Sequence, residues 1–152
     1  MNRKYLPTLS ELIDRLSIVQ LKEVFIPEHK SEYSKEIADI IHDIQAHINE
    51  NDAVIDAEVI RAVVVLSQMN LHIWHNETNY RKGIKDGNNL ELTHGLNGIR
   101  NTAKNKIQEI VDNQQMVSEI IGEARGYFER NILPKNQVDI IFSFLRDFEI
   151  FK

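Results

Sequence analysis

The amino-acid sequence predicts an all-α fold, an up-and-down bundle of five or six helices in a single domain over residues 1–152. Apolar residues recur with a period near 3.6 through most of the chain, which is typical of helices that bury one face. The 152 residues include only 6 Gly and 3 Pro, few for a fold that is rich in turns. A chain of this length is enough for one domain with its own core.

The first two helices are predicted by a cap, by a proline and by the apolar pattern. Thr8 and Glu11 have the spacing of a capping box, so the first helix is expected to start there and to end before Pro27. Two apolar stripes lie on different sides of this helix, which predicts that it is sandwiched between neighbours. The second helix is expected to begin at Ser31 or Ser34. Its apolar stripe consists of Ile37, Ile40, Ile41, Ile44 and Ile48.

The remaining helices follow from periodicity and from one clear loop. A third helix is expected over residues 56–82, and the run Val63–Val65 is read as helical because of its flanking periodicity. Residues 83–89 are typical of a loop, and its shortness predicts antiparallel helices on either side. A fourth helix is expected from Thr93, and the sequence leaves open whether residues 93–131 form one helix or two. A last helix is expected over residues 138–148.

Composition and charge exclude several classes of protein. The chain has no cysteine, which excludes a disulfide scaffold and a cysteine-based zinc site. No segment approaches the roughly 18 uncharged apolar residues of a membrane span, and no apolar signal stretch follows the N-terminus. A net charge of −5 argues against a broad nucleic-acid surface. We therefore expect a cytoplasmic protein without a membrane contact.

Polar residues interrupt the apolar stripes of the third and fourth helices at matching levels. On a helical wheel, Glu77 lies within about 20° of Asn70, and Trp74 within about 40°. Arg100 lies inside the apolar stripe of the fourth helix. Because Glu77 and Arg100 are at similar distances from the loop, we expect an ion pair between them. The candidate ligand-binding site comprises Asp14, Ser17, Asn70, Trp74, Glu77, Asn97, Arg100, Asn101 and Lys104, the first two hydrogen-bonding into it from the first helix.

The local charge favours an anionic ligand at this candidate site. Residues 80–106 contain six basic and two acidic side chains, a net charge of +4, so the rest of the chain carries −9. Arginine binds phosphate and carboxylate groups through paired hydrogen bonds. A buried Arg–Glu pair can equally serve only to fix the register of two helices. The residues leave both interpretations open.

Three segments of the chain resemble a family of all-helical proteins from bacteria and tailed phages, including a small conserved protein of T4-type phages. Leu12–Lys22 resembles the family's opening motif, Asn70–Glu77 its tryptophan–histidine helix, and Leu96–Asn101 its Leu-Asn-x-x-Arg-Asn segment. In the bacterial proteins an acidic pair often follows the tryptophan–histidine pair, whereas here Thr78 follows Glu77. The resemblance implies a helical fold and a role for the polar cluster, and it implies no particular activity.

These observations predict a small helical binding or accessory protein. The resemblance implies that a phage encodes it, and a phage-encoded protein of this kind is expected in the host cytoplasm. Its candidate ligand is a small anion bound between the third and fourth helices. The aromatic residues after position 140 are expected to pack on the core or to pair with a second subunit, which favours a homodimer.

The alternative function is a small metal-dependent enzyme acting on a nucleotide or another phosphorylated metabolite, with Glu77 as base or metal ligand. Glu36, Asp39 and Asp43 are similar to the magnesium-binding helix of all-α nucleotide pyrophosphohydrolases. The companion acidic helix of those enzymes is missing, so a solvated acidic face is the simpler interpretation. Zinc and di-iron motifs are absent from the sequence, and no residue is assigned to a metal.

Overall fold

The computed structural model describes residues 6–84 and 89–129, and all regular structure in these ranges is helical. The elements are α1 (Leu9–Phe25), a short 3₁₀ helix η1 (Pro27–His29), α2 (Lys30–Glu50), α3 (Ala57–Arg81) and α4 (Asn89–Glu129). The predicted all-α fold class is confirmed. The described ranges contain four α-helices rather than five or six, and the helix expected over residues 138–148 lies outside them.

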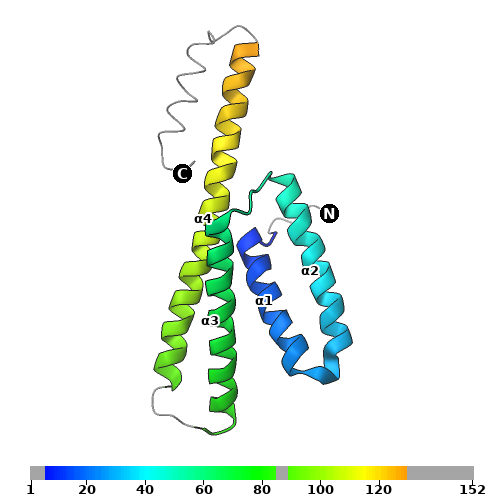
Figure 1. The fold of residues 1–152 in the computed structure, drawn as a ribbon, viewed down its shortest axis with the longest axis vertical. Coiled ribbons are helices and arrows are strands. Elements are labelled where there is room, and N and C mark those ends of the chain that lie inside the picture. The colour runs from blue at the N-terminus through cyan, green and yellow to red at the C-terminus, as the bar shows by residue number, and fades with distance from the viewer. Residues whose placement is uncertain (1–5, 85–88, 130–152) are drawn as a thin grey trace.

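The helices form two antiparallel hairpins, α1–α2 and α3–α4, and successive helices alternate in direction (Figure 1). One side of α1 lies against α2, and its other side lies against α3 and α4. Within the described ranges, α2 makes no close backbone contact with α3 or α4. α1 is therefore the sandwiched helix that its two apolar stripes predict.

Local signals determine where the helices begin. The Thr8 hydroxyl accepts the N–H of Glu11 at 3.3 Å, and the Glu11 carboxylate accepts the N–H of Thr8 at 2.8 Å, which is the predicted capping box. Asp56 caps α3 by accepting the N–H of Val59 at 2.9 Å. α2 begins one residue before the earlier predicted start, and α4 begins at Asn89 rather than Thr93. Residues 93–129 belong to a single helix.

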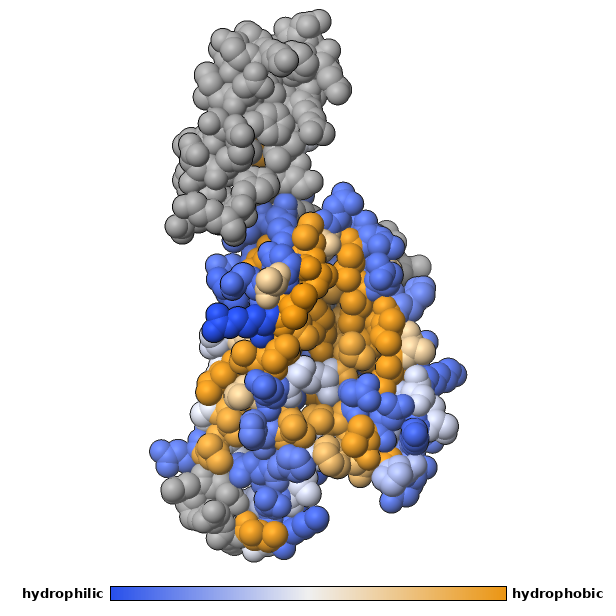
Figure 2. Space-filling view, viewed as in Figure 1, coloured by the Kyte–Doolittle hydropathy of each residue, from blue (hydrophilic) through white to orange (hydrophobic). Residues whose placement is uncertain are grey.

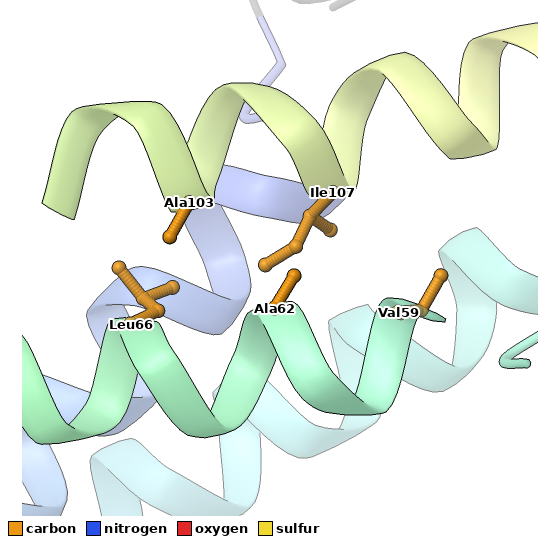
Figure 3. Close-up of a cluster of buried hydrophobic side chains, with 5 residues drawn as sticks. All are labelled: Val59, Ala62, Leu66, Ala103 and Ile107. Carbon is orange, nitrogen blue, oxygen red and sulfur yellow. The ribbon is translucent and has the colours of Figure 1, made fainter. Parts of the chain in front are cut away.

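Two clusters of buried apolar side chains form the core, the larger one within the α3–α4 hairpin and the smaller one between the hairpins. In the larger one, side chains from α3 and α4 point toward one another (Figure 3): Val59, Ala62, Leu66, Ala103 and Ile107. The smaller cluster contains Leu9, Ala53 and Val111, so it joins the start of α1 to α4 and to the α2–α3 connection. Ile13 packs against both clusters, which makes α1 part of one continuous core.

The α2–α3 connection is fixed to α4 by the side chain of Gln114. This side chain accepts the N–H of Val54 at 2.9 Å and donates to the Val54 carbonyl at 3.1 Å. Ala53 is buried beneath the connection, whereas Val54 and Ile55 are exposed. An ordered backbone therefore presents two aliphatic side chains at the surface.

Candidate functional site

A polar cluster forms where α1, α3 and α4 meet, and its centre is Asp14 rather than Glu77. Asp14 and Asn70 are only 7% and 5% exposed. The Nε of Arg100 donates to Oδ1 of Asp14 at 3.1 Å, and its Nη2 donates to Oδ2. Two parallel hydrogen bonds between a guanidinium and a carboxylate make a strong, directional ion pair. The cluster therefore joins α1 to α4 through opposite charges.

Asn70 joins α3 to the same carboxylate. Its side-chain Nδ2 donates to Oδ1 of Asp14 at 2.9 Å and lies 3.3 Å from the Oγ of Ser17, to which it also donates. Asp14 and Ser17 are three residues apart on α1, so they lie on one side of that helix. The expected hydrogen bonds from Asp14 and Ser17 into the cluster are thus present in the structure.

The prediction of an ion pair between Glu77 and Arg100 is wrong. Glu77 instead lies 3.8 Å from Arg81 on its own helix, and its side chain is 48% exposed. α1 ends at Phe25, whose ring stacks on Trp74 with 6.0 Å between the centroids. Glu77 lies nearly one turn beyond Trp74, where α1 no longer covers the stripe. Its carboxylate therefore stays in water, the usual environment for this residue type.

The other predicted site residues divide between the cluster and its surroundings. Asn97 belongs to the cluster's edge, because its Oδ1 accepts from Nη1 of Arg100 at 3.4 Å. Lys104 is half-buried and acts on Asp14 through its charge. Trp74 packs on Phe25, and Asn101 is exposed.

Sequence reasoning missed Asp14 as the partner of Arg100, although one signal indicates it. Asp14 lies between the two apolar stripes of α1, a helix that is covered on both sides. A carboxylate in such a position needs a buried partner. The α3–α4 hairpin supplies that partner through Arg100.

The pKa of Asp14 is set by two opposing effects. Burial raises this pKa, because it disfavours the charged carboxylate. Hydrogen bonds from Arg100 and Asn70, together with the charges of Arg100 and Lys104, outweigh burial and hold the pKa of Asp14 below its ordinary value. Asp14 is therefore ionised at neutral pH and compensates the charge of Arg100 inside the protein.

We expect Asp14 to make stability depend on pH in the acid range. A carboxyl group whose pKa is lower in the folded state contributes stability that is fully present above its unfolded pKa of about 3.9, and that is lost as the pH falls through the folded value. Urea unfolding of the wild type and of Asp14→Asn, from pH 7 down to about pH 2.5, measures this contribution. The difference in unfolding free energy between the wild type and Asp14→Asn should shrink as the pH falls. A difference that stays constant would contradict a lowered pKa of Asp14 in the folded state.

The polar cluster around Asp14 has the features of an ion pair that stabilises the fold. Among the described residues, every buried side-chain nitrogen or oxygen has a hydrogen-bond partner. A buried pair with all its hydrogen bonds satisfied defines one arrangement of the elements that carry it. Because Asp14 is on one hairpin and Asn70 and Arg100 are on the other, the cluster sets how the two hairpins pack.

Comparison with models of protein families, with curated proteins and with solved structures finds no match to this chain. The resemblance to helical proteins of bacteria and phages therefore stays a prediction. In residues 6–84 and 89–129, no group of three or more His, Asp or Glu side chains is placed to hold a metal ion. No helix in the same ranges is long and apolar enough to cross a membrane.

Proposed function

We propose that the protein is a small helical binding or accessory protein that acts through its surface, while the Asp14–Arg100 pair holds its two hairpins together. One observation carries the proposal. Four exposed aliphatic side chains lie close together in the chain, two in the α2–α3 connection and two in the first turns of α3. They are Val54, Ile55, Ile60 and Val64, and they are called the α3 apolar face below.

The exposure of the α3 apolar face is high for side chains of this type. The four side chains are between 41% and 59% exposed. Ile60 and Val64 are four residues apart, so they share one side of α3. Figure 2 shows apolar side chains gathered over the middle of one face of the molecule, with hydrophilic regions around them. Exposed apolar surface with a polar surround usually marks a site of protein–protein contact.

A second copy of this chain is the partner that we propose for the α3 apolar face. A two-fold symmetric interface pairs a surface patch with itself, and such dimers are the commonest oligomers. The four side chains are uncharged, so burying them against one another desolvates no charge of their own. This supports the homodimer that the sequence led us to expect.

The anionic-ligand function expected from the sequence has less support from the geometry. Arg100 would have to release Asp14, a carboxylate that the fold itself holds in contact, before it could bind a free anion. The enzyme alternative depends on Glu77, which pairs with the exposed Arg81 and shares no contact with Arg100. Neither function is therefore the one we propose.

Placing charge on the α3 apolar face tests the proposed function. We expect the wild type to dimerise with increasing concentration in sedimentation velocity runs between about 1 and 100 μM. Ile60→Lys combined with Val64→Lys should weaken the dimer by about 100-fold or more, because four lysines would be buried without partners in each dimer.

The matched control for this test is Leu92→Lys combined with Ile99→Lys on α4, since these side chains are 52% and 50% exposed and lie outside the α3 apolar face. It should dimerise like the wild type. Circular dichroism checks that every variant keeps its helical content. A wild type that stays monomeric at the highest concentration would overturn the proposal, as would equal dissociation of the control.

A further inference from the structure

A groove lies between the start of α1 and α2, with a volume of about 460 Å³. This volume is in the range of clefts that bind ligands. Its aliphatic lining residues are Leu6, Pro7, Leu12, Ile40 and Ala46, and the two buried ones, Leu12 and Ile40, are called its floor below. Its wall is acidic and consists of Glu36, Asp39, Asp43 and Glu50, all on α2. The groove thus combines apolar surface with negative charge.

Among the described residues, most of this negative charge has no arginine or lysine beside it. Arg15 is the one described arginine or lysine that lines the groove, and its Nη2 lies 2.8 Å from Oε1 of Glu36. His47, which also lines the groove, is hydrogen-bonded to Asn51 at 3.0 Å. Within the described part of the chain, no ion pair or hydrogen bond joins Asp39, Asp43 or Glu50 to another element.

The acidic residues of the groove share one side of α2. Their spacings of three, four and seven residues place them along one face of the helix. The opposite side of α2 carries uncharged residues, namely Ser34, Ala38, Ile41 and Gln45. The negative charge of this helix is therefore concentrated beside the aliphatic floor, where both can contact the same bound molecule.

We propose that this groove binds a short segment of a partner protein in which lysine or arginine residues alternate with apolar residues. The apolar side chains of such a segment would lie on Leu12 and Ile40. Its cationic groups would reach the carboxylates of Asp39, Asp43 and Glu50, and the aliphatic stems of lysine and arginine pack well along apolar surface. A bare magnesium ion would use oxygen ligands and leave the floor without a role. This surface is separate from the α3 apolar face, so the two proposals can fail independently.

Fluorescence anisotropy with a labelled nine-residue peptide of alternating lysine and leucine tests the proposal. The wild type should bind this peptide at low salt and more weakly at about 0.15 M salt, because exposed charges are screened. The variant Asp39→Asn, Asp43→Asn, Glu50→Gln should bind at least about tenfold more weakly. The matched control removes three carboxylates outside the groove: Glu28→Gln, Glu32→Gln and Glu58→Gln. It has the same net charge as the groove variant and should bind like the wild type.

Four outcomes would overturn the proposal. Equal loss of binding in the control would show general electrostatic attraction. Equal binding of a peptide with serine in place of leucine would show that the floor is not used. Competition by Mg²⁺ beyond that of sodium chloride at matched ionic strength would indicate a cation site. A marked gain of binding after removal of residues 1–5, which contain Arg3 and Lys4, would identify the chain's own segment as the occupant.

Discussion

Replacing Arg100 with methionine is expected to lower the free energy of unfolding by about 3 kcal/mol. Methionine keeps much of the side-chain length but removes the charge. It leaves the Asp14 carboxylate, whose side chain is only 10% exposed, without its partner. Removing one member of a buried pair is costly because the remaining charge stays desolvated. Urea denaturation at neutral pH measures this loss directly.

A double variant and a variant at a distant position test whether the loss of stability comes from breaking the Asp14–Arg100 pair. Asp14→Leu together with Arg100→Met should recover most of the lost stability, since replacing both members of a buried pair with apolar groups is often close to neutral. Glu77→Gln should change stability by less than about 0.5 kcal/mol, because its pair with Arg81 is exposed. Equal destabilisation by Glu77→Gln and by Arg100→Met would contradict the assignment of Asp14 as the partner that stabilises Arg100.

Truncating Leu66 to alanine is expected to destabilise the protein by about 3 kcal/mol or more. Leu66 is 0% exposed and lies in the cluster between α3 and α4 (Figure 3). The loss combines the transfer free energy of the removed methyl groups with the cavity left between two helices that cannot close completely. Thermal or urea unfolding gives the magnitude.

Val24→Ala is the matched control for the Leu66 truncation. Val24 is 62% exposed on α1, so its loss should change stability by no more than about 0.5 kcal/mol. Comparable effects at the two positions would mean that the α3–α4 interface contributes little to the core.

Much of the fold could be predicted because its signals are local. The capping box at Thr8 and Glu11 involves residues three apart, so the sequence shows it directly. The buried positions of α3 follow from the helical period, which explains why Val59, Leu66 and Asn70 are all buried. Even the sandwiched position of α1 follows from its two apolar stripes.

The candidate site could be predicted only in part. The sequence predicts that Asp14, Ser17, Asn70 and Arg100 belong to one cluster, because each breaks an apolar pattern or lies beside one. The predicted pairing of Arg100 with Glu77 is wrong, since the helical wheel gives directions around one axis and not how far a neighbouring helix extends. α1 covers Asn70 but ends at Phe25 beside Trp74, and Glu77 is left in water.

The sequence by itself determined the all-α class, the capping box of α1 and which faces of the described helices are apolar, because each of these depends on residues within a few turns of one another. Tertiary structure decided which carboxylate meets Arg100, because that depends on the relative position and length of α1, α3 and α4. It also decided that the acidic side of α2 borders a groove with an aliphatic floor. Those properties involve residues from different helices, and no local pattern contains them.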